Sequence, residues 1–416
     1  MRRMLAWIGT MFCLAIPIAG LAVDKVEPVK PPPTSAASIL IDANNGTVLC
    51  EKNAHARLPM ASTTKIMTAL LIAEYGKLDE VVTISKHASE TPYSPLTLVP
   101  GEKVPLRDLL HAILMRSAND AAVAAAEHIA GSEPAFVKMM NAKARELGAK
   151  DTHFCNPNGL YVKGHYTTAY DLAQIARYAL KYDVIDEVLV TPSVVIDRSI
   201  SKQNALIPNK NRFLEKFEGA DGVKTGYTKE AGHCFVGSAT RNGYRLISVV
   251  LNSTDYLTET SNLMTWGFDR FEVVKLGEPG QTYGRVTVPG GRPKRVAAIA
   301  PDGVIAIVRK GHADSVKAKT IVDDVELPLE KGHPIAHVQI LVDGKPIGTA
   351  ALVAPCPISK SPIYLPPVRL IVLIGLALGS IYGARYVTTT PETDGRARRR
   401  VQKSGGRDYR SWEGDR

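Results

Sequence analysis

The spacing of apolar positions predicts helices in the middle of the chain. Leu106, Leu109, Leu110, Ile113 and Leu114 follow the i, i+3, i+4, i+7 pattern that places side chains on one face of a helix. Similar spacing, with glycines as stop signals, predicts further helices over residues 62–73, 120–130, 133–147 and 256–274. The middle of the chain is therefore expected to be mainly helical.

Strand patterns precede and follow these helices. The first pair of strands, 38–43 and 47–50, is joined by Asn44-Asn45-Gly46, and a second pair is joined by Asn242-Gly243. Asparagine and glycine tolerate the left-handed backbone conformations of tight turns, so each site predicts a β-hairpin. Strands at both ends with helices between them predict an α+β domain over residues 36–275.

Residues 276–356 have a different texture. Short apolar segments alternate there with turn pairs such as Asp302-Gly303 and Asp343-Gly344. The candidate strands are 286–288, 296–299, 304–308 and 335–340. We therefore predict a second, small all-β domain of a size that can fold alone.

The first 35 residues have the pattern of a targeting segment followed by a linker. Arg2 and Arg3 precede an apolar run that ends in small residues at Ala22, which is typical of a cleaved signal peptide over residues 1–22. A membrane anchor or a buried helix is the alternative interpretation, but the run is short for a span. The proline-rich residues 23–35 predict a stiff, extended linker.

Residues 369–386 predict a membrane anchor near the other end. The segment between Arg369 and Arg385 is uncharged and apolar on every side, unlike an amphipathic surface helix. It is shorter than the ~20 residues that cross a bilayer, but flanking arginines can reach the interface. The basic residues of 387–416 predict a cytoplasmic tail. The folded body is therefore expected on the outer face of the cytoplasmic membrane.

The net charge of +10 does not indicate a nucleic-acid-binding domain. The 416 residues include 51 Lys and Arg against 41 Asp and Glu. Segment 1–22 carries two of the ten excess charges and segment 385–416 carries four, which leaves four for the body between them. A body of mixed sign lacks a basic binding face, so we expect no nucleic acid partner. Binding through the basic tail alone is the remaining alternative.

Histidine and cysteine patterns do not predict a metal site or another cofactor. The ten histidines have no metal-site spacing, and His333 and His337 lie in a strand-like stretch without an acidic partner motif. Four cysteines remain after the predicted signal peptide, none of them in a Cys-x-x-Cys pair, and they allow three disulfide pairings or free thiols. They are Cys50, Cys155, Cys234 and Cys356.

Three short motifs carry candidate chemistry. They are Ser62-Thr63-Thr64-Lys65, Ser117-Ala118-Asn119 and Lys224-Thr225-Gly226. Each motif alone also fits a helix cap, a turn between helices or the start of a hairpin. A second Ser-x-x-Lys runs from Ser199 to Lys202, but it lies in a polar stretch without helical spacing. We interpret that copy as a surface loop.

The first motif suits nucleophilic catalysis. At the start of a helix, Ser62 and Lys65 lie one turn apart on the same side. A serine hydroxyl is a weak nucleophile until a base takes its proton. Lysine can be that base once burial or a neighbouring cation lowers its pKa from ~10.4, and Lys224 can supply that second charge. No Gly-x-Ser-x-Gly elbow competes for this role.

The other two motifs suit proton transfer and carboxylate binding. The Ser117 hydroxyl can relay a proton to a leaving amine, and the Asn119 amide can orient Lys65 or the substrate. Lys224 and Thr225 can bind a carboxylate. Gly226, without a side chain, lets a substrate approach the backbone of a strand.

In this combination the motifs resemble those of the serine-type D-alanyl-D-alanine carboxypeptidases, the low-molecular-weight penicillin-binding proteins of the peptidase S11 family. The resemblance runs from about Ser38 to Pro355. Its most specific stretches are 58–68, 117–121, 152–160, 165–172 and 221–228. It implies a bacterial enzyme with a penicillin-binding-protein/β-lactamase-like fold, in which a helical lobe packs against an antiparallel sheet and a β-rich domain follows.

The resemblance also implies a role for each motif residue. Ser62 would be acylated, Lys65 would be its base, and Ser117 would complete the catalytic set. The substrate-binding residues would be Asn119, Lys224, Thr225, Gly226 and Tyr227, the last at a position where some members have histidine. The amides of Ser62 and Tyr227 would form the oxyanion hole. The implied substrate is the peptidoglycan pentapeptide stem, and β-lactams are the implied inhibitors.

Three alternatives are weighed against this hypothesis. A β-lactamase of class A uses a glutamate for deacylation, and no Glu-x-x-x-Asn motif lies between Ser117 and Lys224. A D,D-endopeptidase would use the same residues on a crosslinked substrate. A non-catalytic wall-binding or β-lactam-sensing protein would not need an intact serine–lysine pair.

Overall fold

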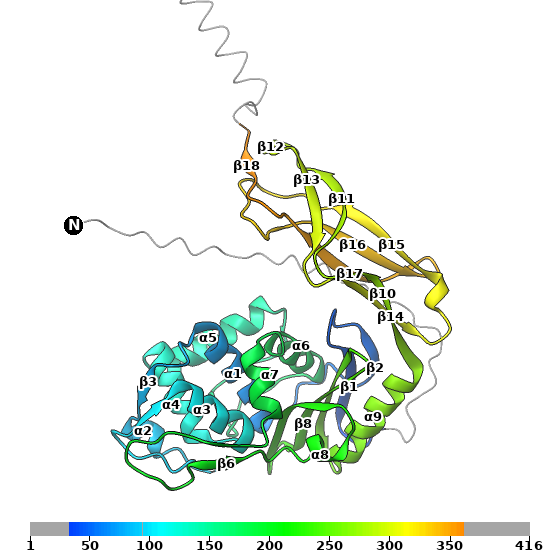
Figure 1. Cartoon of the computed structure of the whole chain (residues 1–416). Helices are drawn as coiled ribbons and strands as arrows, with labels where there is room; N and C mark the ends of the chain where they lie inside the picture. The colour runs from blue at the N-terminus through cyan, green and yellow to red at the C-terminus, as the bar shows by residue number, and fades with distance from the viewer. Residues whose placement is uncertain (1–32, 94, 362–416) are drawn as a thin grey trace, which may run out of the picture.

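The computed structural model describes residues 33–93 and 95–361, which form two bodies, as Figure 1 shows. The larger body combines helices with a sheet, and the smaller one is built of strands and extends from the end of helix α9 (Tyr256–Arg270). The predicted fold class, an α+β domain followed by a small all-β domain, is confirmed.

A five-stranded antiparallel sheet forms the centre of the larger body, with the order β2-β1-β9-β8-β7. The strands are β1 (Ala37–Asp42), β2 (Val48–Lys52), β7 (Ala220–Thr228), β8 (Gly232–Arg241) and β9 (Tyr244–Ser253). Both predicted hairpins are confirmed, and β1 pairs with β9 across some 200 residues of sequence, with Ile39 opposite Val249. Strand β7, which carries the third motif, lies at the edge of this sheet.

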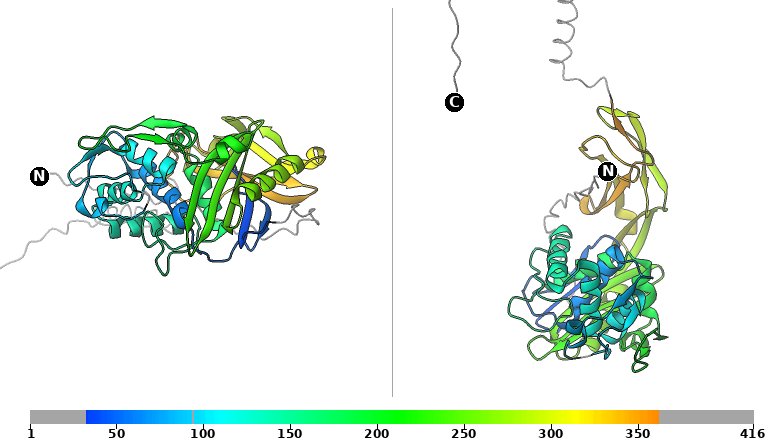
Figure 2. Two further views of the ribbon diagram at one scale, coloured as in Figure 1. Left: turned by 90° about the horizontal axis from the view of Figure 1, so that it is seen from below. Right: turned by 90° about the vertical axis from the view of Figure 1, so that its left-hand side faces the viewer.

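Side chains along each strand point alternately to the two faces of the sheet, and both faces are buried. Ile39 and Ile41 of β1 point into the main core beneath the helical lobe, while Leu40 between them points into a second core on the opposite face. Figure 2 shows the strands between these two layers. The helical lobe contains α1 (Lys65–Tyr75), α2 (Lys86–Ser89), α3 (Leu106–His111), α4 (Asn119–Ala130), α5 (Glu133–Glu146), α6 (Ala169–Ala179) and α7 (Asp183–Val190).

Short two-stranded sheets border the helical lobe. One pairs β3 (Val81–Thr83) with β4 (Lys103–Pro105), and the other pairs β5 (Ser193–Val195) with β6 (Leu206–Pro208). The opposite face of the main sheet is covered by α9 and by the short helix α8 (Phe213–Lys216).

The prediction of a single helix over 256–274 was wrong at its end. Helix α9 stops at Arg270, and the next residues form strand β10 (Phe271–Gly277), which pairs with β14 (Val304–Arg309). The Phe271 ring packs against Trp266 at 5.6 Å between ring centroids. Strand pairing with a distant segment therefore overrides the local helical pattern.

Two predicted helices also differ from the structure, one at its start and one at its end. Ser62 lies in a separate 3₁₀ turn, η1 (Ala61–Thr64), and the α-helix begins only at Lys65. The helix that starts at Leu106 changes after His111 into a π-helical turn, η2 (Ala112–Arg116). Such wide turns are rare and are often found at functional sites. Both irregular segments directly adjoin motif residues.

The smaller body is a β-domain with its own apolar core. Its main sheet has the order β11-β13-β17-β16-β15, and two strand pairs complete it. Besides β10 and β14, its strands are β11 (Gln281–Thr287), β12 (Gly291–Arg292), β13 (Arg295–Ala300), β15 (Val316–Val322), β16 (Pro334–Val342), β17 (Lys345–Val353) and β18 (Ser359–Lys360). The four predicted strands are present, and β10, β12, β15, β17 and β18 are additional.

The predicted signal peptide, nearly all of the predicted linker, the membrane anchor over 369–386 and the basic tail lie outside the described residues. Within residues 33–93 and 95–361, no helix is long and apolar enough to cross a membrane.

Candidate active site

The nucleophile candidate lies on a tight turn between a loop and helix α1. Ser62 is the second residue of η1, and the preceding Ala61 has a left-handed backbone with φ of +47°. Alanine rarely adopts this conformation because its Cβ is too close to the following carbonyl. The turn is therefore held in place by its surroundings.

Lys65 is fully buried beside this serine. Its Nζ donates to Ser62 Oγ at 3.1 Å, to Asn119 Oδ1 at 2.7 Å and to the Asn158 carbonyl at 2.5 Å. Burial lowers the pKa of Lys65 well below its ordinary value, and the charge of Lys224 lowers it further. Burial or a neighbouring cation was expected to lower the pKa of this lysine, and both are present.

The second motif joins the π-helical turn to helix α4. Ser117 follows η2 with a left-handed φ of +67°, which turns the chain so that Asn119 can begin α4. Besides accepting from Lys65, Asn119 donates to the Pro92 carbonyl at 3.0 Å. Asn119 thus connects the buried lysine to the loop that borders the site.

The third motif lies on edge strand β7, where the strand passes the nucleophile turn. Lys224 is 2 % exposed, and burial lowers its pKa to about 7, with a further contribution from the positive charge of Lys210. Its Nζ donates to the Thr225 carbonyl at 2.9 Å. A lysine with so few partners is well placed to bind an anion.

Gly226 brings β7 into close contact with the nucleophile turn. A Cβ atom at this position would lie 2.9 Å from the amide nitrogen of Ser62 and 3.1 Å from that of Thr63. Only glycine therefore fits here without moving the backbone. The next residue, Tyr227, is 62 % exposed, and its ring lies 4.7 Å from that of His233.

The second Ser-x-x-Lys sequence is a surface loop, as predicted. Ser199 is exposed, and its hydroxyl accepts from the Lys103 amide at 2.7 Å. Lys202 donates to the Arg198 carbonyl and makes no hydrogen bond to Ser199. The spacing that unites Ser62 with Lys65 therefore has no chemical counterpart in this loop.

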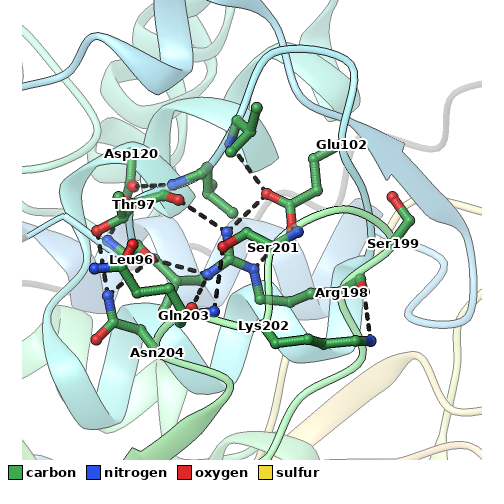
Figure 3. A network of polar contacts seen from close by, with 12 residues as sticks. Leu96, Thr97, Glu102, Asp120, Arg198, Ser199, Ser201, Lys202, Gln203 and Asn204 are labelled. Carbon is green, nitrogen blue, oxygen red and sulfur yellow. Dashed lines mark hydrogen bonds and ion pairs between the residues drawn. The ribbon is translucent and has the colours of Figure 1, made fainter.

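A buried ion pair holds the loop that borders the site, as Figure 3 shows. Arg198 donates to both carboxylate oxygens of Glu102, at 2.8 and 2.7 Å, and neither side chain is exposed. Asp120, which follows the second motif, accepts from the amides of Leu96 and Leu98. Leaving one member of such a pair without its partner costs ~3–5 kcal/mol. The loop is therefore fixed firmly against the start of α4.

The structure brings Ser62, Lys65, Asn119, Lys224 and Gly226 together where η1, the start of α4 and β7 meet. Ser117, Thr225 and Tyr227 adjoin these residues along the chain. Two further residues that act on the site were not predicted: Asn158, whose carbonyl accepts from Lys65, and Lys210, whose charge acts on Lys224. A backbone carbonyl carries no side-chain signature, and only the stretch 152–160 pointed to that region. Lys210 is one of many lysines and has no motif around it.

Metal ligation and disulfides play no part in the described geometry. Among residues 33–93 and 95–361, no group of three or more His, Cys, Asp or Glu side chains is placed to hold a metal ion. The four cysteines in this range are all free thiols: Cys50, Cys155, Cys234 and Cys356.

A serine beside a buried lysine, next to a Lys-Thr-Gly strand at the edge of an antiparallel sheet, defines the class of penicillin-recognising serine enzymes. Residues 25–255 match the family model of D-alanyl-D-alanine carboxypeptidases. The chain belongs to this family, peptidase S11. Residues 271–358 match the model of the C-terminal domain of penicillin-binding protein 5.

Individual relatives agree over most of their length. The D-alanyl-D-alanine carboxypeptidase DacF of Bacillus subtilis is 34% identical over 366 residues, which cover 85% of this chain and 94% of the relative. DacA of Escherichia coli is 34% identical over 361 residues, 83% of this chain and 88% of the relative. The structure of penicillin-binding protein 5 from Haemophilus influenzae has a TM-score of 0.65 at 32% identity and covers 81% of this chain and 100% of that chain. The prediction of a bacterial serine D-alanyl-D-alanine carboxypeptidase is thereby confirmed.

Proposed function

We propose that this site removes the terminal D-alanine from peptidoglycan pentapeptide stems through an acyl-enzyme on Ser62. The observation that carries the proposal is the position of the buried Lys65, whose Nζ lies 3.1 Å from Ser62 Oγ and whose pKa is lowered by burial and by the charge of Lys224. In its uncharged form this lysine can accept the serine proton directly. No histidine or aspartate is needed for that step.

In the acylation step, Lys65 takes the proton of Ser62, and the serine oxygen attacks the carbonyl carbon of the penultimate D-alanine. The peptide bond breaks, and the proton taken up by Lys65 passes through the Ser117 hydroxyl to the leaving amine of D-alanine, which leaves Lys65 uncharged again. Asn119 keeps the lysine aligned, because its side-chain oxygen accepts from Nζ at 2.7 Å.

Binding of the substrate is assigned to strand β7. Lys224 and Thr225 pair with the terminal carboxylate, whose negative charge favours the protonated form of the buried lysine. The amides of Ser62 and Tyr227 stabilise the oxyanion, a contribution of ~10²–10³ in rate for each donor. The close approach of Gly226 to the Ser62 amide supports this assignment.

Deacylation completes the cycle. Water attacks the acyl carbonyl, Lys65 takes a proton from that water, and the proton returns to the Ser62 oxygen as the tetrapeptide leaves. A β-lactam acylates the same serine, and its ring-opened product has no departing amine that makes room for water. We therefore expect a long-lived adduct with penicillin.

The test is an assay of the purified full chain with a pentapeptide that ends in D-Ala-D-Ala, and separately with penicillin. We expect release of free D-alanine, together with a mass increase of one penicillin that peptide mapping places on Ser62. Rapid turnover of penicillin would instead indicate a β-lactamase, and cleavage of crosslinked dimers alone would indicate an endopeptidase. Absence of all three activities would point to a wall-binding or β-lactam-sensing protein.

We further propose that residues 1–22 direct secretion and that residues 369–386 anchor the chain, with 387–416 as its cytoplasmic tail. The catalytic domain 36–275 and the β-domain 276–356 then lie on the outer face of the cytoplasmic membrane, next to the wall. The proposal is supported by the signal-like start and by the uncharged segment between Arg369 and Arg385.

Fractionation of cells tests this topology. The full chain should sediment with membranes and resist extraction by high salt, whereas a chain that stops at residue 361 should appear in the soluble fraction outside the cytoplasm. External protease should remove the β-domain of spheroplasts and spare an epitope added after residue 416. Recovery of the full chain in the soluble fraction would contradict the anchor.

A further inference from the structure

A chain of hydrogen bonds runs behind the nucleophile turn and ends on His165. The Thr64 hydroxyl donates to the Ala61 carbonyl at 2.8 Å and lies 2.8 Å from His165 Nε2. The other ring nitrogen, Nδ1, accepts from the Cys155 amide at 3.0 Å. Thr64 lies inside the first motif, but no chemical role has been assigned to it. His165 lies outside all three motifs.

The turn that this chain supports is strained. Ala61 has a left-handed backbone directly before the nucleophile, a conformation that costs on the order of 1–3 kcal/mol for a residue with a side chain. Its carbonyl is enclosed by Gly159, where a Cβ would lie 2.0 Å from the Ala61 oxygen. The direction of the Ala61 carbonyl therefore determines where the following Ser62 stands.

The hydrogen bonds fix the position of the proton on the ring. Because Nδ1 accepts from a backbone N–H, it carries no proton, and the neutral ring has its proton on Nε2. Nε2 therefore donates to the Thr64 oxygen, whose own hydrogen is thereby directed to the Ala61 carbonyl. The Nε2–H and the Thr64 hydroxyl each donate to an acceptor, and Nδ1 accepts from a donor.

We propose that His165 is a positioning residue for the nucleophile: through Thr64 it holds the Ala61 carbonyl and with it the attack geometry of Ser62. The proposal rests on the assignment of Ser62 as the acylated residue. His165 does not touch the substrate, and it exchanges no proton with it. Its contribution is to keep one hydroxyl in one orientation.

The surroundings keep the ring neutral. His165 is 4 % exposed, and burial lowers its pKa to about 4, with smaller contributions from the charges of His153 and Lys65. The edge of the Phe154 ring packs against it at 5.9 Å between centroids. A protonated ring would direct an Nδ1–H at the Cys155 amide, so the neutral form is the only one that satisfies both ends.

The segment that carries His165 also serves Lys65. Residues 155–165 supply the Asn158 carbonyl that accepts from Lys65 Nζ and the Gly159 that encloses Ala61. His165 closes this segment onto itself through the Cys155 amide. Nucleophile and base are therefore held by one segment, from two sides.

Two substitutions separate the two arms of the ring. His165→Gln keeps an amide N–H near the position of Nε2, where it can donate to Thr64, but offers no acceptor to Cys155. His165→Asn keeps an oxygen near the position of Nδ1, where it can accept from Cys155, but is too short to reach Thr64. A residue that only stabilises the segment should tolerate Asn at least as well as Gln.

The test measures penicillin binding and acylation separately in the full-length variants, with melting temperature as the control for folding. His165→Asn should lower the acylation rate constant by about 10–100-fold without changing the dissociation constant of the pre-covalent complex, because misplacement by about 1 Å has effects of this size. His165→Gln should remain within about threefold of wild type. Equal acylation in both variants, or better acylation in His165→Asn, would overturn the proposal.

A second pair of variants addresses the same chain from its other end. Thr64→Val should reproduce the loss of His165→Asn, Thr64→Ser should not, and combining Thr64→Val with His165→Asn should add little to either loss. Additive losses would show that the two residues act separately and would overturn the proposal. If wild-type protein gains no adduct on Ser62, the proposed function fails first; equal rates in an acylated wild type and its variants reject the His165 role alone.

Discussion

Replacing Ser62 with alanine should abolish both the penicillin adduct and the release of D-alanine, whereas Ser199→Ala should leave both at the wild-type level. Loss of the nucleophile in an enzyme that forms a covalent intermediate lowers the rate by roughly 10⁴-fold or more. Ser199 is an exposed loop residue whose hydroxyl accepts from the Lys103 amide. The lysine of its motif, Lys202, donates to the Arg198 carbonyl instead of approaching Ser199. The pair of variants therefore compares two identical spacings in two different environments.

The measurement is the intact mass after incubation with penicillin, together with a coupled assay for free D-alanine. Ser62→Ala should retain the wild-type melting temperature within a few degrees, because Ser62 Oγ makes one described hydrogen bond, from Lys65. An adduct on the Ser62→Ala protein, or loss of the adduct in Ser199→Ala, would contradict the assignment of Ser62 as the nucleophile.

The sequence predicts the fold best where the pattern is local. Both hairpins around Asn44-Asn45-Gly46 and Asn242-Gly243 form where the turn residues predict them. The prediction fails where pairing with a distant strand determines the secondary structure. Residues 271–274 continue a helical spacing of apolar residues, but they form a strand that pairs with β14. Strand β17 was not predicted because Pro346 and Gly348 interrupt its pattern, and its pairing with β16 supplies what the sequence lacks.

The site residues, too, could be predicted where the signal is local in the sequence and could not where it depends on contacts between distant residues. The three motifs are short and carry side-chain chemistry, so their residues could be predicted together with the reason for each. The Asn158 carbonyl and the ion pair of Arg198 with Glu102 could not, because the first is a backbone atom and the second joins residues 96 positions apart. His165 lies in a stretch that resembles the family, but its neutral state follows only from the burial and contacts that the fold creates.

The two buried lysines of this site, Lys65 and Lys224, suit different roles because their hydrogen-bond partners differ. Lys65 is held by three uncharged oxygens of Ser62, Asn119 and Asn158, and burial together with the charge of Lys224 lowers its pKa more than the charge of Asp120 raises it. Lys224 has one described hydrogen-bond partner, the Thr225 carbonyl, and is the residue proposed above to bind the substrate carboxylate. An incoming anion would therefore favour the charged form of Lys224.

Replacing Lys65 with arginine should lower the acylation rate by about 10²–10⁴-fold, the usual contribution of a general base. Arginine keeps a positive charge and can still donate to Asn119, but it cannot lose its proton in a protein. The wild-type kcat/KM should rise with pH as Lys65 becomes uncharged and fall as Lys224 loses its charge with a pKa of about 7. In kcat the fall should occur at higher pH, because the bound carboxylate raises the pKa of Lys224.

The pH profile of Lys65→Arg distinguishes a lost base from a disturbed site. If Lys65 is the base, the rising limb disappears in the variant while the falling limb, which belongs to Lys224, remains. If the substitution only distorts the pocket, both limbs persist at a lower overall rate, and the assignment of Lys65 as base is wrong. Because the two lysines interact, the limbs report the pair rather than either residue alone. The falling limb should therefore lie at higher pH in Lys65→Met than in Lys65→Arg, because the permanent charge of the arginine opposes protonation of Lys224.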